Sequence, residues 1–147
     1  MRAAYLILFL ILFCSVAKAE NVILHRSYFG RADRVDFLVP REELRKVRPW
    51  EPAAGTDAPL SRSQALEIVR KAALAEGLDI SDDSKLAISL TRTNPFEEEL
   101  IKRLPPGCCR WFYLVNFMGE DAALKGKFSF LVSMSGAVAS KAVAPSQ

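Results

Sequence analysis

The stretch PPGCCRWFYLVNFMG, residues Pro105–Gly119, decides the fold because it sets two adjacent cysteines before a long apolar run. Aromatic and β-branched side chains favour a strand here. One face of that strand is apolar, with Trp111, Tyr113, Val115 and Phe117. The other face is apolar too, with Phe112, Leu114 and Met118. A strand that is apolar on both faces is typical of the centre of a sheet, so we expect it to be covered twice.

The two cysteines, Cys108 and Cys109, are the candidate thiol or disulfide site of the chain. Consecutive α-carbons lie about 3.8 Å apart, below the usual disulfide range of about 4.4–6.8 Å, so a vicinal disulfide would strain the backbone. Adjacent thiols also fit neither a four-ligand zinc site nor a thioredoxin-like motif. The favoured interpretation sends one thiol into the core and the other nearer solvent. A strained vicinal bridge and an intermolecular disulfide stay open as alternatives.

Upstream of this strand, SRSQALEIVRKAALAEG predicts the longest helix. Ser61 and Gln64 form a capping box, and Gly77 stands where a left-handed residue ends a helix. The predicted apolar stripe contains Leu66, Val69 and Ala73. We expect this stripe to pack on the Trp111 face of the strand, since both surfaces need an apolar partner.

The remaining elements are shorter. Alternating apolar residues predict strands around 35–39, 86–90 and 128–134, and a turn at Ser135–Gly136 leads into a last strand at 137–141. Short helices are expected within 41–48 and 94–104, the second burying Phe96, Leu100 and Leu104, while the segment from Asn21 to Val35 reads as loosely ordered. The predicted fold class is α+β, with one long helix on a mainly antiparallel sheet of about four strands and short accessory helices.

The N-terminus resembles a secretory signal peptide. Arg2 precedes an apolar run, and Ala17-Lys18-Ala19 supplies small residues before a cleavage point after Ala19. The run is short for a membrane span, although a retained anchor is the alternative. We therefore expect residues 1–19 to be a signal peptide and the mature protein to be periplasmic or extracellular.

The charge of the mature chain argues against nucleic acid as a partner. Cleavage after Ala19 lowers the number of basic residues from 20 to 18, against 17 acidic residues, so the net charge falls to +1. Such a chain has no electrostatic attraction for nucleic acid or an anionic membrane surface. No further segment has the length and apolar character of a membrane span, so we expect none in the mature chain.

Few residues suggest chemistry. His25 is the only histidine, which disfavours acid–base and triad mechanisms, and we expect it to be exposed in a loose segment. The run Glu97–Glu99 reads as the acidic first turn of a helix rather than a catalytic pair. Trp50 and Trp111 read as packing residues more than as a ligand platform. The sequence therefore predicts no enzyme, no catalytic residue, no metal site and no cofactor.

The pattern over residues 61–138 resembles the PepSY-like group of small extracytoplasmic bacterial domains, whose fold is akin to cystatin. The matching positions are Ser61, Ala65, Ala72 and Gly77 in the helix, then Trp111, Tyr113, Val115, Val132, Gly136 and Val138. Ser133 departs from the pattern, where an Asp is common, and so does the helix inserted at 94–104. The resemblance implies a non-catalytic role, sometimes proposed as protease modulation, and carries no functional residue over to this chain.

These observations predict an extracytoplasmic, non-enzymatic binding or modulator domain, with a self-associating structural envelope protein as the alternative and an enzyme less favoured. The expected organisation is a signal peptide at 1–19, an N-terminal extension at 20–60, a PepSY-like domain at 61–142 and a frayed tail at 143–147. The expected partner is an extracytoplasmic protein, and the expected assembly is a monomer or a weak homo-oligomer. Binding is expected on loops, with 94–107 and 116–127 as the roomiest candidates.

Overall fold

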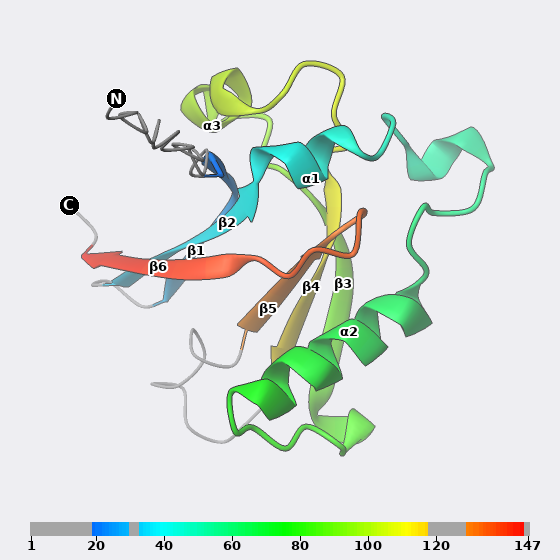
Figure 1. The fold of residues 1–147 in the computed structure, drawn as a ribbon, viewed down its shortest axis with the longest axis vertical. Helices are drawn as coiled ribbons and strands as arrows, with labels where there is room; N and C mark the ends of the chain where they lie inside the picture. Colours follow the sequence, from blue (N-terminus) through cyan, green and yellow to red (C-terminus); the bar gives the residue numbers. More distant parts are fainter. Residues whose placement is uncertain (1–18, 30–32, 118–128, 146–147) are drawn as a thin grey trace, which may run out of the picture.

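The computed structural model describes residues 19–29, 33–117 and 129–145, which form two three-stranded antiparallel sheets (Figure 1). The first sheet has the order β1-β2-β6 and the second β3-β4-β5. The strands are β1 (Asn21–Phe29), β2 (Asp33–Pro40), β3 (Leu86–Arg92), β4 (Trp111–Phe117), β5 (Ser129–Ser133) and β6 (Ser140–Pro145). The helices are α1 (Arg41–Arg45), η1 (Pro52–Ala54), α2 (Arg62–Ala75), η2 (Asp83–Lys85) and α3 (Glu98–Arg103).

Strand β4 lies at the centre of its sheet and is covered on both faces, as its sequence predicts. On one face Tyr113 and Val115 belong to a core cluster with Val69 of α2. On the other face Phe112 belongs to a second cluster with Phe37 of β2. The second sheet is thus the middle layer, between α2 and the β1-β2-β6 sheet.

The predicted fold class is wrong in its architecture. A helix on one sheet of about four strands was expected, but the strands divide into two sheets of three, and α2 is the only helix longer than six residues in the described part of the chain. The physical reason is the second apolar face of β4, which needs a partner that the single helix cannot supply. That partner is a sheet built from both ends of the described chain, as Figure 1 shows.

Strand β1 corrects the expectation of a loosely ordered N-terminal segment. It pairs with β2 from Asn21 opposite Pro40 to Phe29 opposite Asp33, with a register shift between Ile23 and His25. Such a bulge breaks the alternation of buried and exposed residues, which hides the strand from a pattern of period two. Val22 and Leu24 of β1 lie in the same core cluster as Leu131 and Ala139, so the expected extension at 20–60 shares a core with the expected domain at 61–142.

The C-terminal segment joins the two sheets. After β5 the chain turns at Gly136, whose φ is 86°, and Ala139 donates a backbone hydrogen bond to Leu131 of β5. From Ser140 onward the chain leaves β5 and pairs with β2 instead. Residues 143–145, expected to be frayed, are therefore the last part of β6, and Pro145 lies opposite Asp33.

The helix predictions are confirmed at α2 and corrected at α3. Both hydrogen bonds of the capping box between Ser61 and Gln64 are present. The fully buried residues of α2 are Ala65, Val69 and Ala73. Val69 and Ala73 belong to the predicted stripe, but Ala65 takes the place expected for Leu66, which is only partly buried. Helix α3 begins later than expected, and Phe96, expected inside, is 91% exposed.

Some predictions fall outside the described residues. The predicted signal peptide does so up to residue 18, and so does most of the predicted 116–127 binding loop. Among the helices of the described part, none is both long and apolar enough to cross a membrane.

Candidate functional site

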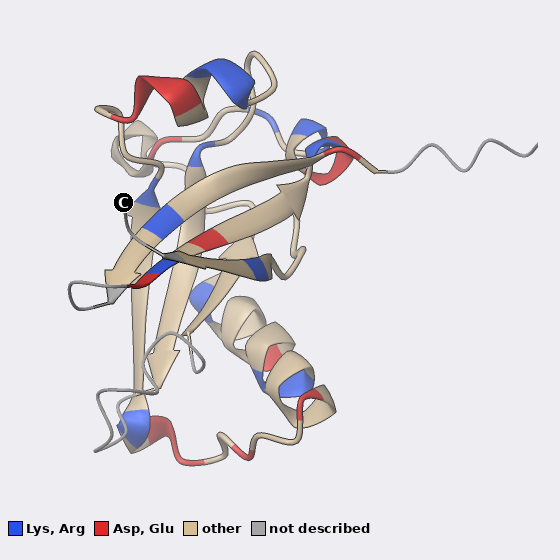
Figure 2. Ribbon diagram, turned by 90° about the vertical axis from the view of Figure 1, so that its left-hand side faces the viewer, with Lys and Arg blue, Asp and Glu red and all other residues tan. Residues whose placement is uncertain are grey.

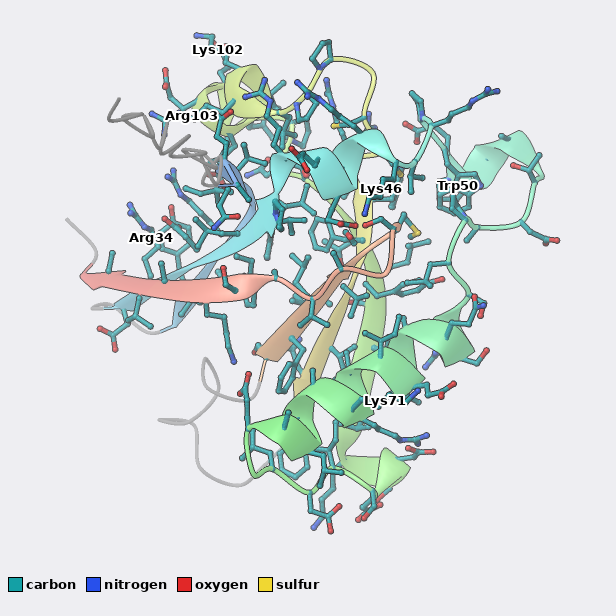
Figure 3. All side chains as sticks on the ribbon, in the orientation of Figure 1. Arg34, Lys46, Trp50, Lys71, Lys102 and Arg103 are labelled. Carbon is teal, nitrogen blue, oxygen red and sulfur yellow. The ribbon has the colours of Figure 1, made fainter. Side chains whose placement is uncertain are left out.

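A cavity of about 290 Å³ opens at the end of the middle sheet where β3 stops and β4 begins. Three segments meet there: the link after α1, the end of β3 and the loop that leads into β4. Its lining residues are Pro49, Trp50, Glu51, Arg92, Gly107, Cys108 and Arg110. Figure 3 shows Trp50 in the link after α1, well away from Lys102 and Arg103 of α3.

Three lining residues, Trp50, Glu51 and Arg92, are connected to one another through Trp111, which lies outside the cavity lining. The Trp111 indole donates a hydrogen bond of 2.9 Å to Oε2 of Glu51. Arg92, which pairs with Trp111 across β3 and β4, forms an ion pair of 3.4 Å with Oε1 of the same carboxylate. The Trp50 indole packs edge-on against that of Trp111 and donates to the carbonyl of Thr56. The charge of Arg92 is thus largely neutralised by Glu51.

A second arginine of the cavity lining, Arg110, has no partner among the described residues. It forms no ion pair or side-chain hydrogen bond within the described ranges, although it is only partly exposed. Its backbone is fixed, because the Arg110 carbonyl accepts a hydrogen bond of 2.9 Å from the backbone N–H of buried Thr93. The cavity lining therefore combines an arginine on a fixed backbone, whose guanidinium has no partner among the described residues, with the indole of Trp50, a combination that suits a carboxylate with a flat apolar body.

The two cysteines are free thiols on opposite sides of the middle sheet. Cys108 belongs to the cluster shared with the β1-β2-β6 sheet, and Cys109 to the cluster under α2. The predicted separation onto two faces is confirmed, but both thiols are buried, at 7% and 4% exposure, so neither lies nearer solvent.

The Cys108 thiol borders the cavity without the character of a nucleophile. Burial raises the pKa of Cys108, and the charges of Arg110 and Arg41 only partly oppose that shift. The thiol is therefore protonated at neutral pH, whereas the thiolate is the reactive form.

His25 corrects another expectation, because it lies in β1 and is partly buried between the two sheets. Its ring centroid lies 5.9 Å from that of Phe37 and 5.2 Å from that of Phe112. Burial lowers the pKa of His25, and the negative charge of Glu97 opposes this effect. Nε2 of His25 lies 3.0 Å from the Ser27 hydroxyl, a pairing that resembles a nucleophile and its base. No residue of this pair lines the cavity.

The run Glu97–Glu99 does not act as a unit. Glu97 forms an ion pair of 3.5 Å with Arg26, while Glu98 pairs with Lys102 one turn along α3. Figure 2 shows α3 with acidic residues in its first half and basic residues in its second, the order favoured by the helix dipole. A search of the described segments finds no group of three His, Cys, Asp or Glu side chains arranged to hold a metal ion.

Sequence reasoning identified Trp50, Trp111 and Cys108 as noteworthy but missed the two arginines and Glu51. The three cavity segments are far apart in the chain, and no local spacing connects them. The register of β3 on β4, which places Arg92 opposite Trp111, is the signal that would have linked them. It becomes visible only once the strands are paired.

No protein family, no curated protein and no solved structure matches this chain. The resemblance to PepSY-like domains therefore stays a prediction, and the function must be argued from the site itself.

Proposed function

We propose that this protein is an exported, non-enzymatic binding domain that takes a small organic carboxylate, or a carboxylate at the end of a chain, in the cavity beside Arg110. The observation that carries the proposal is that Arg110 lines a cavity of about 290 Å³ and that its guanidinium has no partner among the described residues. A guanidinium binds a carboxylate through two parallel hydrogen bonds, and each charge-assisted bond contributes more than a neutral one.

The Trp50 indole in the cavity lining supports an apolar body on the ligand. Trp50 is fixed by its hydrogen bond to Thr56 and by its edge-on contact with Trp111, which is itself bonded to Glu51, so the indole surface is in place before a ligand arrives. A binding site that is already formed loses little conformational freedom on binding. Glu51 lines the same cavity, but its carboxylate is paired with Arg92 and accepts the Trp111 hydrogen bond, so Arg110 is the cation that remains for a ligand carboxylate.

A binding role fits the chemistry better than catalysis. The cavity thiol has a raised pKa, and the only histidine lies between the sheets rather than in the cavity. Protease modulation, which the PepSY-like resemblance implies, is not part of the proposal because no residue carries that role.

The export half of the proposal rests on the sequence before Glu20, with its apolar run and Ala17-Lys18-Ala19 ending. N-terminal sequencing of protein recovered from the periplasm or medium should give a mature chain that begins at Glu20. Protein that still begins at Met1 in the membrane fraction would contradict export and favour a retained anchor.

The binding half is tested by calorimetric titration with benzoate, and with benzamide as its uncharged counterpart. Benzoate should bind saturably and benzamide should not. Arg110→Gln should weaken benzoate binding about tenfold or more, because a charged hydrogen-bond partner is lost.

Arg103→Gln is the matched control. It removes the same charge from an exposed position on α3, far from Trp50 in Figure 3, and should leave benzoate affinity unchanged. N-acetylphenylalanine, which carries the carboxylate of a chain end, and its uncharged amide are titrated in the same way. Tighter binding of N-acetylphenylalanine than of benzoate would indicate a chain-end carboxylate, and tighter binding of benzoate a small free acid. If Arg110→Gln and Arg103→Gln bind benzoate with equal affinity, Arg110 does not hold the carboxylate and the proposed site is wrong.

A further inference from the structure

We propose that β3 is the interface of a symmetric homodimer, in which the β3 strands of two copies pair antiparallel about Ser89. The two middle sheets would then form one continuous sheet of six strands. This assembly goes beyond the proposed binding function and does not depend on it.

The first argument is that β3 is the only strand edge among the described residues without a protective feature. Exposed edges are normally blocked by bulges, charges, proline or covering chain. Strand β1 has a bulge before His25, β6 contains Lys141 and ends at Pro145, and β5 is covered by its bridge from Val132 to Val138.

Strand β3 has no bulge, no proline and no covering strand among the described residues, and its single charge, Arg92, stands at its end. Its register on β4 runs without a shift from Leu86 opposite Phe117 to Arg92 opposite Trp111. Its sequence LAISLTR has no proline and no charge before the terminal arginine. Strand β3 is an edge strand of the β3-β4-β5 sheet. The edge that faces away from β4 has no strand partner among the described residues. A regular, uncharged edge of seven residues is a template for another strand.

The second argument is that this strand is complementary to itself. Antiparallel pairing about Ser89 places Ile88 opposite Leu90 of the other copy, and Ala87 opposite its Thr91. Leu90 is 37% exposed, so a partner's isoleucine would cover an apolar side chain that the single chain leaves in water.

The other face and the ends of the strand fit the same pairing. The Ser89 hydroxyl already lies 3.2 Å from that of Thr91, so the two copies would place four hydroxyl groups side by side at the centre. At each end Arg92 would face the apolar Leu86 of the other copy, so no like charges are opposed. A second copy of the chain is thus the partner that fits this edge, and the resulting interface has the two-fold symmetry of most homodimers.

The test uses charge at the symmetry position. Ser89 is exposed, so the domain should tolerate Ser89→Glu and Ser89→Lys, with folding checked by circular dichroism. In either variant two like charges would meet directly across the interface. Sedimentation equilibrium of the full chain should show a dimer for the wild type and a monomer for each variant.

Mixing the two variants should restore a dimer that contains one chain of each, because glutamate then faces lysine. Leu74→Lys, an exposed apolar position on α2, is the control and should leave the dimer intact. A wild type that stays monomeric across the dilution series, a dimer that persists in Ser89→Glu, or variants that fail to combine would each overturn the proposal.

Discussion

The two faces of the β3-β4-β5 sheet are covered in different ways. On one face α2 packs closely because small residues, Ala65 and Ala73, are fully buried along its inner stripe. On the other face a sheet supplies the cover, and the contact is built from larger side chains, Phe37 and Phe112. The helix comes from one continuous segment of the chain, whereas the covering sheet takes β1 and β2 from one end and β6 from the other. Strand β4 contributes to both cores. It therefore joins a core whose cover comes from one continuous segment to a core whose cover is assembled from distant segments.

The largest expected effect comes from truncating the sheet-facing core. Phe112→Ala should lower the free energy of unfolding by about 3–5 kcal/mol, because a fully buried ring is lost where the two sheets meet. Val69→Ala on the α2 side should cost about 2 kcal/mol, since only two methyl groups are removed. Urea denaturation of the two variants measures both losses. A larger loss of unfolding free energy for Val69→Ala than for Phe112→Ala would contradict this prediction, because the core under α2 would then contribute more than the core between the sheets.

The next effect concerns the hydrogen bond that ties the layers together. The Thr93 hydroxyl, fully buried after β3, donates a bond of 2.9 Å to the carbonyl of Leu24 in β1. Thr93→Val keeps the shape but leaves that buried carbonyl without this donor, which should cost about 1–3 kcal/mol in denaturant unfolding. Thr91→Val, whose hydroxyl lies 3.2 Å from that of the exposed Ser89, is the matched control and should change stability by about 0.5 kcal/mol or less. Equal losses of unfolding free energy in the two variants would show that the hydrogen bond from Thr93 to Leu24 does not stabilise the fold.

The cysteines probe the same two cores with a smaller change. Cys108→Ala acts on the sheet-facing cluster and Cys109→Ala on the α2-facing cluster, and each should cost about 1 kcal/mol. Both thiols are free, so a reducing agent should not shift the thermal melt of the wild type. A large fall in melting temperature on reduction would reveal a disulfide that stabilises the fold.

The smallest effect is a dependence of stability on pH that His25 introduces between the sheets. Burial lowers the pKa of folded His25 below its ordinary value of 6.5, so the unfolded chain takes up a proton first as the pH falls. Stability should therefore decrease as the pH falls through about 6.5 and should be unaffected by His25 well above it. Melting temperatures between about pH 7.5 and 5.5 should show this fall in the wild type and less of it in His25→Gln. An equal fall in both proteins would assign it to other groups.

The sequence predicted the α2 side of the molecule well because each signal there is local. The capping box at Ser61, the period of the helix and the alternation along β4 all lie within single elements. The sheet-facing side was missed for two physical reasons. The bulge near Leu24 interrupts the alternation of β1. The C-terminal segment contacts β5 through residues 137–139 and then pairs with β2 as β6 from Ser140, without any break in its composition.

The candidate site was predicted only in fragments. Trp50 and Cys108 stood out by residue type, but Arg92, Glu51 and Arg110 are ordinary surface residues until the chain is folded. Their meeting depends on the register between β3 and β4 and on the path of the link after α1. Such long-range placement leaves no trace in the spacing of one sequence.

The central claim, that Arg110 and its cavity form a carboxylate-binding site, is tested most directly by amide and indole NMR spectra recorded during a benzoate titration. If the carboxylate binds beside Arg110, saturable shifts should be confined to the cavity lining, above all at Trp50, Gly107 and Arg110, with α3 unchanged. Benzamide should not change the chemical shifts of the same signals. Shifts that do not saturate, or that affect Arg103 of α3 as much as Arg110, would contradict the claim.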